Sequence, residues 1–445
     1  MKMVDNRRFI IDQEKCDALC TCGSRHTIPR LNLYAGEDAY AKLAEDCRNT
    51  IGKGAVLLVD DENTHMAAGA SISGLFEKQA LNFKTVRLPG DSALTDRLAQ
   101  EIYDSGIGNN LIIAVGAGTI NDLGKYVADR LGIPCWSVPT APSMNGYTSS
   151  IAAVKVKGVK RTLPAAPPQS IYVRPAVIQE APLRLRQAGF CDVLAKSVSD
   201  FDWQTESLLF EGSYCGLPSA ILNEPEQKYI HHPEKILRGD MDTVLGLFEG
   251  LLFSGIAMSL AGSSAPASGG EHLISHFLDM RESITGKKPE LHGLQVGAGV
   301  VLAAVCYRML ADLETKDLRP AAQKKFEADA RQIPSVWGGL AQEVERQFKK
   351  KQKRLLAFDT LLPANWQHLK ALFGRVKKPE FFTDLIRRSG FGMTLPSLGI
   401  SNDEFFLAAV CARTIRERIT VLDLAAHAGI LEDAAQATVK LLTRS

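Results

Sequence analysis

The chain has 445 residues, of which 45% are hydrophobic and 23% are charged, and its formal net charge is +2. This balance is typical of a globular protein and gives no reason to expect nucleic acid or a membrane surface as a partner. No uninterrupted apolar run reaches the roughly 20 residues of a membrane span, and residues 1–8 lack the apolar core of a secretion signal. We therefore expect a cytoplasmic protein of one large or two ordinary domains.

Nine cysteines is an odd count, and most of them lie in apolar surroundings that indicate buried thiols in a reducing compartment. An N-terminal group stands apart and consists of Cys16, Cys20, Cys22 and His26. It could bind a metal, although the Cys20-x-Cys22 spacing is tighter than in a usual zinc knuckle and no second pair follows. The favoured interpretation is a turn that leads into a strand.

Strands and helices alternate over the first part of the chain. Apolar runs predict strands, and helical patterns separate them; the strands are 55–59, 83–88, 111–115 and 135–138, and the helices are 64–75, 94–103 and 118–131. This alternation predicts a parallel sheet covered by helices on both faces. Residues 151–170 then predict a basic hairpin or flap, and 170–173 a last strand.

Strand signals stop after about residue 181, and helical patterns take over. Five of them are clear, at 245–260, 293–313, 321–331, 380–388 and 403–418. The chain is therefore expected to have an α/β domain over residues 1–181 and an all-α domain over residues 182–445.

Gly116 and Gly118 follow the third strand directly and open a helix. In that place, backbone N–H groups and the helix N-terminus can hold a pyrophosphate, and glycine removes the Cβ that would block its approach. The full G-x-G-x-x-G spacing is absent, so a plain tight turn remains an alternative. Asp60 and Asp61 end the first strand, where a carboxylate can bind an adenine ribose and repel the 2′-phosphate of NADP. The alternative is a helix-capping Asp.

A loop rich in hydroxyl groups follows the fourth strand, from Thr140 to Ser149. Ligands bind at the carboxyl ends of parallel strands, so this loop is a second candidate for ligand contacts. The alternative is a loop that Pro142 and Gly146 stabilise without any ligand.

One carboxylate and three imidazoles form the third candidate group. His272 and His276 are four residues apart, which places them on one face of a helix. His292 opens the next long apolar pattern, and Asp192 is expected at the start of a helix of its own. One Asp and two His are the ligands of a divalent cation that keeps positions open for a substrate oxygen. The alternative is surface histidines, or one core histidine bonded to a carbonyl.

Five motifs in order make the chain recognisable. They are Gly116-Ala-Gly-Thr-Ile-Asn-Asp122, Pro139-Thr-Ala-Pro-Ser-Met-x-Gly-Tyr-Thr-Ser149, Gly189-Phe-x-Asp192, Gly270-Glu-His272-x3-His276 and His292-Gly-x-Gln-Val-Gly297. Together they resemble sn-glycerol-1-phosphate dehydrogenases of the bacterial AraM type, within the group of iron-containing alcohol dehydrogenases and dehydroquinate synthases. The resemblance runs essentially end to end, and its last segment is Ile415-Arg-x-Arg-x-Thr-Val-Leu-Asp-Leu424.

The resemblance implies a Rossmann-like N-terminal domain, a helical C-terminal domain and an active site between them. It implies that Asp192, His272 and His292 hold zinc, nickel or iron, and that His276 and Asn145 contact the substrate. The residues implied at NAD(H) or NADP(H) are Gly116, Ala117, Gly118, Thr119, Asp122, Thr140, Ser143 and Ser149, and Asp61 joins them from the strand-end argument. The family's glycerol-phosphate enzymes usually carry Asp where this chain has Asn145, so the polyol could differ.

The expected function is interconversion of glycerol 1-phosphate, or a related polyol phosphate, with dihydroxyacetone phosphate or the matching ketose phosphate. The metal would act as a Lewis acid, and His276 or a water it holds would relay the proton. Lys160 and Arg161 on the flap could hold a phosphate, or could be a solvated basic loop. The alternatives are a dehydroquinate synthase-like cyclase or lyase and a non-catalytic relative. The expected partner is a small phosphorylated molecule, and the expected assembly is a homodimer or a larger homo-oligomer.

Overall fold

The computed structural model describes residues 16–18, 20, 22–26, 28, 30–210 and 212–443. Residues 1–8, in which the sequence predicts no secretion signal, lie outside the described residues. The chain forms two compact units: unit 1 comprises 1–189 and 216–263, and unit 2 comprises 190–215 and 264–445. These compact units divide the chain after residues 189, 215 and 263. The domain boundary that the sequence suggests at residue 181 stays a prediction.

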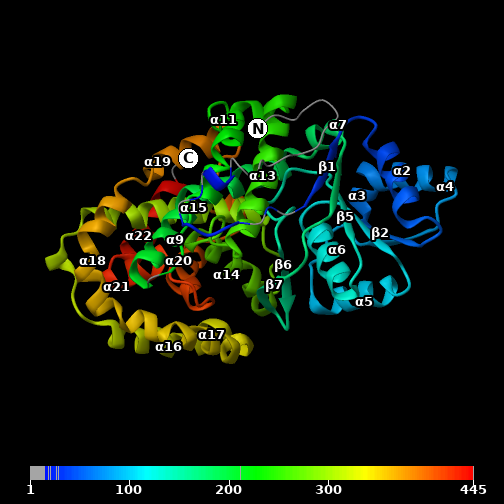
Figure 1. The fold of residues 1–445 in the computed structure, drawn as a ribbon. Coiled ribbons are helices and arrows are strands. Elements are labelled where there is room, and N and C mark those ends of the chain that lie inside the picture. Colours follow the sequence, from blue (N-terminus) through cyan, green and yellow to red (C-terminus); the bar gives the residue numbers. More distant parts are fainter. Residues whose placement is uncertain are drawn as a thin grey trace. The chain divides into compact units, whose positions relative to one another are not determined.

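Unit 1 is built on a six-stranded parallel sheet (Figure 1). Its spatial order is β1-β8-β5-β4-β2-β3, which confirms the predicted parallel sheet. The strands are β1 (Asn32–Ala35), β2 (Val56–Asp61), β3 (Phe83–Leu88), β4 (Leu111–Val115), β5 (Cys135–Val138) and β8 (Ser170–Val173).

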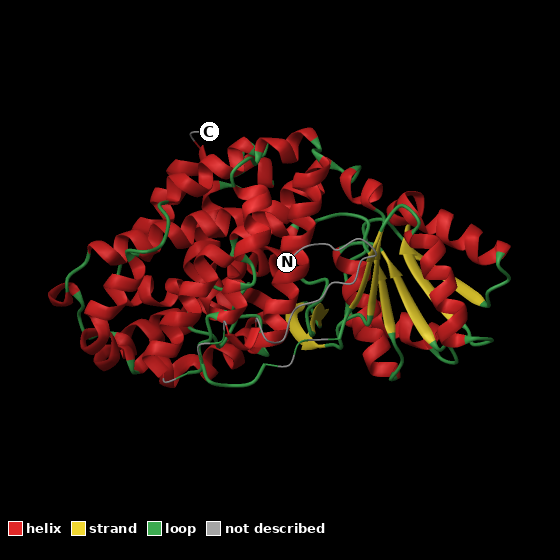
Figure 2. Cartoon of the chain, turned by 45° about the horizontal axis from the view of Figure 1, so that its top comes forward, coloured by secondary structure: helices red, strands yellow, loops and turns green. Residues whose placement is uncertain are grey.

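Helices cover both faces of this sheet (Figure 2). Successive side chains of a strand point to opposite faces, so Val56 and Leu58 of β2 pack with one set of helices and Leu57 and Val59 with another. The first set is α2 (Ala39–Ile51) and α4 (Ala70–Lys78), and the second is α5 (Asp96–Gly106) and α6 (Gly118–Leu131). The apolar runs in the strands are therefore continuous because both of their faces are buried.

The chain reverses its winding direction between β2 and β4, which are neighbours in the sheet. After β2, a short helix α3 (Glu62–Thr64), a π-helical turn (His65–Gly69) and α4 lead outward to β3. After β4, α6 lies on the other face and leads to β5. Open α/β sheets bind ligands at the carboxyl ends of the two strands at such a switch point. Here those ends carry Asp61 and Gly116.

The remaining elements of unit 1 are one hairpin and several helices. Strands β6 (Ile151–Val156) and β7 (Val159–Pro164) pair antiparallel, which confirms the predicted hairpin. The helix α13 packs against four shorter helices of the same unit. These helices are α13 (Met241–Ala261), α7 (Pro175–Gln179), α10 (Leu217–Ala220), α11 (Asn223–Ile230) and α12 (Glu234–Arg238).

Unit 2 contains helices and no strand among its described residues, as the sequence predicts. Its first helix, α8, begins in unit 1. The helices are α8 (Leu183–Leu194), α9 (Lys196–Phe210), α14 (Gly270–Thr285), α15 (His292–Asp312), α16 (Ala322–Trp337), α17 (Ala341–Leu356), α18 (Phe358–Phe373), α19 (Pro379–Arg388), α20 (Asn402–Cys411), α21 (Val421–Ala428) and α22 (Leu431–Thr443). The predicted helix over 403–418 is wrong beyond Cys411, where a 3-10 turn (Ala412–Thr414) and a loop follow.

Two helices are long and apolar enough to span a membrane by length and composition alone, namely α13 and α15. The prediction from uninterrupted apolar runs missed them, because polar residues such as Glu249 and Gln295 interrupt the runs. In each helix, 83% of the apolar window is buried inside the structure. This burial is what the core helix of a globular unit shows.

Candidate functional site

Unit 2 brings Asp192, His272 and His292 together. Each offers one ligand atom, and these atoms lie within 4.8 Å of one another. Asp192 and His272 are 1% and 4% exposed, and the His272 Nε2 atom lies 3.3 Å from a carboxylate oxygen of Asp192. The structure thus assembles the predicted metal-ligand triad from three helices, while the ligand role itself stays a prediction.

The predicted position of Asp192 at the start of a helix is wrong. The helix α8 begins at Leu183, directly after Pro182, and Asp192 lies two residues before its end at Leu194. Proline is common at the start of a helix, so Pro182 marks this boundary, and the Gly189-Phe-x-Asp192 motif lies inside α8. His272 and His292 do lie at helix starts, on α14 and α15.

His272 lies between two carboxylates. Its Nδ1 lies 2.8 Å from Oε1 of Glu271, which can only accept, so Nδ1 carries a proton, and Nε2 is the atom that faces Asp192, at 3.3 Å. Burial alone would lower the pKa of His272, but the hydrogen bonds with Asp192 and Glu271, together with their charges, raise it to about 9. A carboxylate behind a ligating imidazole is the usual support of a metal-bound histidine.

His292 is oriented in a comparable way. The Ser275 hydroxyl donates to Oε1 of Gln295 at 2.7 Å, so it accepts from Nδ1 of His292, also at 2.7 Å. Because a hydroxyl has one proton, this chain of bonds leaves the His292 Nε2 lone pair available for a cation. Both imidazoles therefore present the same atom type, Nε2, as the candidate ligand.

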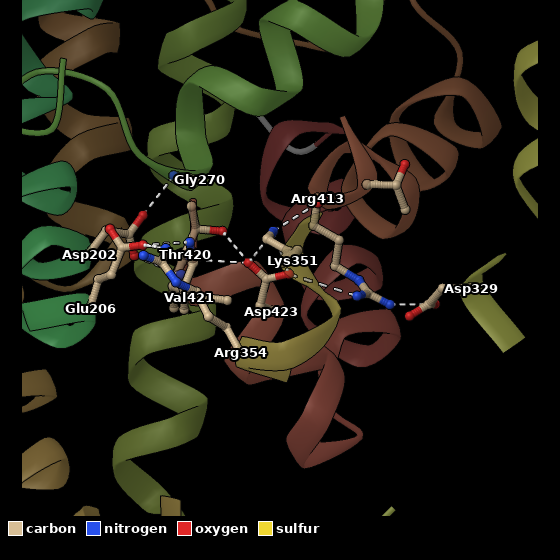
Figure 3. Close-up of polar contacts among 12 residues, drawn as sticks. Asp202, Glu206, Gly270, Asp329, Lys351, Arg354, Arg413, Thr420, Val421 and Asp423 are labelled. Carbon is tan, nitrogen blue, oxygen red and sulfur yellow. Dashed lines mark hydrogen bonds and ion pairs between the residues drawn. The ribbon is translucent and has the colours of Figure 1, made fainter. Parts of the chain in front are cut away.

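Asp202 fixes the start of the helix that carries His272 (Figure 3). It lies in α9 and is 2% exposed, and its carboxylate accepts from the backbone N–H of Gly270 and of Val421, both at 2.7 Å. These are the first residues of α14 and α21, whose N–H groups have no partner within their helices. Burial, and then the nearby charge of Glu271, raises the pKa of Asp202 to about 7. Asp202 thus positions the candidate site without belonging to it.

His276 lies one turn after His272 on α14, as predicted, and its ring stacks on that of His292 with centroids 5.8 Å apart. Nη2 of Arg416 lies 3.1 Å from Nδ1 of His276. A guanidinium can only donate, so Nδ1 accepts and the proton of the neutral imidazole is on Nε2. Burial, and then the charge of Arg418, lowers the pKa of Arg416 to about 10, which still leaves it cationic at neutral pH.

In unit 1, the N-terminus of α6 follows β4, where the sequence predicts a phosphate site. Its N-cap is Ala117, and no side chain caps it, so this end of the helix has unsatisfied donors. A Cβ at Gly118 would meet only Met144, at 3.7 Å. Packing within the chain therefore does not require glycine there, whereas a closely approaching phosphate would.

Lys125 of α6 holds the hydroxyl-rich loop. It is fully buried, and its ammonium donates to the carbonyl oxygens of Gly146 and Ile151, both at 2.7 Å, and to the Ser149 hydroxyl at 3.1 Å. The same ammonium lies 3.0 Å from Asp122. A charge inside the protein must be paired and hydrogen-bonded in this way, so the loop conformation is tightly determined.

Two glycines let helices approach the same loop. A Cβ at Gly189 would lie 1.8 Å from the Pro142 carbonyl oxygen, and a Cβ at Gly255 of α13 would lie 2.2 Å from Oγ1 of Thr148. The Thr148 hydroxyl donates to the Leu252 carbonyl of α13. The loop is therefore held on several sides, and it is a rigid candidate for ligand binding.

The end of β2 agrees with the helix-capping alternative for Asp61. Its Oδ1 accepts from the Thr64 N–H at 2.7 Å, and the Asp61 N–H donates to the Thr64 hydroxyl at 2.9 Å. Asp60 is fully buried and is paired with Arg87 at 3.1 Å and with His65 at 2.8 Å. A role of Asp61 toward a nucleotide stays a prediction.

The remaining site residues are predicted to contact either the cofactor or the substrate. Thr140 is buried, and Thr119 and Ser143 are partly buried. Asn145 lies in the hydroxyl-rich loop, and Lys160 lies in β7 of the hairpin. All five belong to unit 1, whereas the histidine group belongs to unit 2. Their roles toward a cofactor or a substrate stay predictions.

Five residues that support these groups were missed in the sequence, namely Lys125, Asp202, Glu271, Ser275 and Arg416. Glu271 and Ser275 stand inside the motif that contains both His272 and His276, and Arg416 stands in the last matched segment. Their place in these motifs was the available signal. Lys125 carried no signal except its position three residues after Asp122.

Comparison with known proteins identifies the group to which the chain is related. The iron-containing alcohol dehydrogenase family matches residues 34–182. A glycerol-1-phosphate dehydrogenase (NAD(P)+) of Geobacillus stearothermophilus is 31% identical over 327 residues, which are 71% of this chain and 81% of that protein. This chain belongs to the glycerol-1-phosphate dehydrogenase family. A family member of the same name from Thermococcus kodakarensis is 33% identical over 63% of this chain and 79% of its own length.

The fold of this glycerol-1-phosphate dehydrogenase family member also has a solved counterpart. A probable glycerol dehydrogenase from Sinorhizobium meliloti aligns with a TM-score of 0.58 over 93% of this chain and 98% of its own, at 17% sequence identity. At that identity the likeness concerns the fold. The comparisons confirm the resemblance and the fold class that the motifs predict.

Proposed function

We propose that this chain is a metal-dependent, NAD(P)-linked dehydrogenase that interconverts glycerol 1-phosphate, or a related polyol phosphate, with dihydroxyacetone phosphate or the matching ketose phosphate. The observation that carries the proposal is the Asp192–His272–His292 triad, in which Asp192 and His272 are buried, His292 is partly buried and both imidazoles present Nε2. The names of the relatives support the enzyme class, the nucleotide and the substrate class.

The triad fits a divalent cation, since one carboxylate and two imidazoles leave further coordination positions open, and an incoming cation would displace the second proton that the raised pKa of His272 keeps on its ring. Zinc, nickel or iron bound there would act as a Lewis acid and lower the pKa of the substrate's secondary hydroxyl. Glu271 and Ser275 hold the ligand rings, and Asp202 holds the helix start behind them. The chain therefore supplies a site whose geometry is set before any cation binds.

His276 is the group best placed to move the proton of the substrate. Its proton lies on Nε2, and Arg416 occupies Nδ1. The guanidinium disfavours a second proton on this ring, because like charges repel. His276 therefore holds the substrate oxygen, or a water beside it, through a hydrogen bond from Nε2–H, and that water carries the proton between the substrate and the solvent.

The substrate phosphate has two candidate partners. Arg416 lies beside His276 in unit 2, keeps its charge at neutral pH and offers planar donors that match phosphate oxygens. Lys160 is the partner predicted from the sequence, and it lies on the hairpin of unit 1. Arg416 is favoured, because it shares a unit with the triad. Because Asn145 stands where the family's glycerol-phosphate enzymes usually have Asp, the proposal includes related polyol phosphates as substrates.

The nucleotide is assigned to unit 1. The N-terminus of α6 would hold its pyrophosphate through the turn Gly116-Ala117-Gly118-Thr119, and Thr140 and Ser143 would contact it from the rigid loop. Asp122 and Ser149 are bonded within the chain, so their influence on the cofactor passes through the loop conformation. We place the enzyme in the cytoplasm, as a homodimer or a larger homo-oligomer.

A substrate screen tests the proposal. The purified protein, loaded with zinc, nickel or iron, is mixed with dihydroxyacetone phosphate and longer ketose phosphates, with either NADH or NADPH. Oxidation of the nucleotide with one of these ketoses is the expected result. Turnover of a heptulosonate phosphate without net loss of NADH would instead establish the cyclase alternative. If the protein bound neither metal nor nucleotide, both the dehydrogenase and the cyclase hypotheses would be refuted.

A further inference from the structure

The N-terminal Cys20, Cys22 and His26 come together in unit 1. Sγ of Cys20 lies 3.5 Å from Sγ of Cys22, and Sγ of Cys22 lies 3.2 Å from Nε2 of His26. Their ligand atoms lie within 4.8 Å of one another. Two sulfurs and one imidazole nitrogen are a donor set typical of zinc. None of these side chains takes part in the function proposed above.

His26 is held in the tautomer that a metal requires. Its Nδ1 lies 3.0 Å from the carbonyl oxygen of Leu260. A carbonyl can only accept, so Nδ1 carries the proton and the Nε2 lone pair points to Cys22. Leu260 is the second-last residue of α13, where carbonyl groups lack a partner within the helix. The bond therefore satisfies the helix end and orients the imidazole.

The surroundings of the Cys22 thiol also favour metal binding. The Ser24 N–H donates to Sγ of Cys22 at 3.4 Å, which favours the thiolate form that binds metals. For zinc–sulfur and zinc–nitrogen bonds of about 2.3 and about 2.05 Å in a tetrahedron, neighbouring ligand atoms lie roughly 3.8 Å apart for two sulfurs and roughly 3.6 Å for sulfur and nitrogen. The observed separations are within a few tenths of an ångström of these values, so little movement would be needed to admit a cation.

We propose that Cys20, Cys22 and His26 bind a zinc-type divalent cation, which ties the N-terminal segment to the C-terminal end of α13. The remaining coordination position of a tetrahedral ion takes water or another side chain. The competing explanation is a plain hydrogen-bonded turn, in which the Cys22 thiol donates to His26. The two explanations differ in whether the thiols bind metal.

Cobalt(II) is the probe, because a thiolate ligand gives it a charge-transfer absorption band that a site of Asp and His cannot give. The full chain carrying His272→Ala, which removes a ligand of the catalytic triad, is kept reduced and titrated with cobalt(II). The expected result is a thiolate band that saturates at one cobalt per chain. The additional changes Cys20→Ser and Cys22→Ser should remove the band, and Cys47→Ala, which removes a buried thiol of α2, should leave it unchanged.

A second measurement uses the unaltered chain and does not depend on the folding of any variant. Zinc should protect Cys20 and Cys22 from alkylation, as read by mass spectrometry, and a chelator should restore their reactivity. Absence of a thiolate band, or a band that survives loss of both thiols, would overturn the proposal. Equal alkylation of these cysteines with and without zinc would overturn it as well.

Discussion

Gly299 of α15 lies directly against the backbone of Glu271 in α14: a Cβ at residue 299 would lie 2.2 Å from the Glu271 carbonyl oxygen. Glu271 orients His272, and the close approach sets the start of α14 against residue 299 of α15, seven positions after His292. The separation of His272 and His292 thus depends on the absence of one side chain on α15.

Gly299→Ala should weaken metal binding and lower kcat. The new methyl group forces α14 and α15 apart, at a cost of about 1–3 kcal/mol in stability. Metal affinity by competition with a chelator and unfolding by urea check this. Gly74→Ala is the control, since nothing lies within 4 Å of that Cβ and the change should stabilise α4 by up to ~1 kcal/mol. Unchanged metal affinity in Gly299→Ala would contradict the packing argument.

Ser275→Ala removes the group that accepts from Nδ1 of His292. The imidazole then loses its fixed tautomer, and the affinity for the metal should fall by about 10–100-fold. Isothermal titration of the metal-free protein measures this. Ser335→Ala is a matched control, because that exposed hydroxyl bonds only the Gln332 carbonyl. Equal affinities for the two variants would show that Ser275 does not orient the ligand.

Arg87→Ala should shift the nucleotide preference toward NADH. Arg87 and His65 offset the charge of buried Asp60 at the end of β2, and an uncompensated carboxylate repels the 2′-phosphate of NADPH. The ratio of kcat/KM for NADH to that for NADPH should rise by about tenfold, which corresponds to roughly 1.4 kcal/mol. Arg97→Ala, which removes an exposed cation of α5, should leave the ratio unchanged. An unchanged ratio in Arg87→Ala would show that the charge of Asp60 does not determine the nucleotide preference.

Lys351→Met should lower the free energy of unfolding by about 3–5 kcal/mol, because it leaves the buried Asp423 carboxylate without its nearest cation, and the Arg413 guanidinium is 3.9 Å away. Both side chains are fully buried, and Lys351 also donates to the Arg413 carbonyl (Figure 3). Lys350→Met, one residue away, breaks only a loose pair with Glu417 at 3.8 Å and should cost less than about 1 kcal/mol. Similar costs for the two variants, measured by urea denaturation, would contradict this assignment.

His427 should make stability depend on pH. Burial, and then the nearby charge of Lys325, lowers its pKa in the folded state to about 4, below the ordinary histidine value of about 6.5. As pH falls from about 6.5 to about 4, the unfolded chain takes up a proton that the folded chain does not, so stability decreases on acidification. His427→Gln should flatten the curve of Tm against pH in that window. His232→Gln removes an exposed histidine and serves as the control; a slope unchanged in His427→Gln would refute this.

Local sequence patterns were enough to predict much of the fold. The strands β4, β5 and β8 have the predicted bounds, because a parallel strand with both faces buried is a short continuous apolar run. The starts of α14 and α15 were also predicted, so two members of the triad were placed on their helices correctly. The end of α20 was not, since the helical pattern continued past Cys411 although the chain turns there.

The partners of Asp202 and Arg416 could not be predicted, because they lie far away in the chain. Asp202 contacts residues 68 and 219 positions later, and Arg416 meets His276 across 140 positions. Asp192 was misplaced for a different reason, since the start of its helix at Leu183, directly after Pro182, was not recognised in the sequence. The close approach of Gly299 to Glu271 likewise depends on how two helices pack.

The central claim is that Asp192, His272 and His292 bind the metal on which turnover depends. The most direct measurement is dihydroxyacetone phosphate-dependent oxidation of NADH by metal-free protein as zinc, nickel or iron is added, with His272→Ala measured in parallel. The account predicts that activity rises with metal and saturates in the unaltered chain, and that it is absent in His272→Ala at every metal concentration. A His272→Ala protein that turns over without metal would contradict the claim.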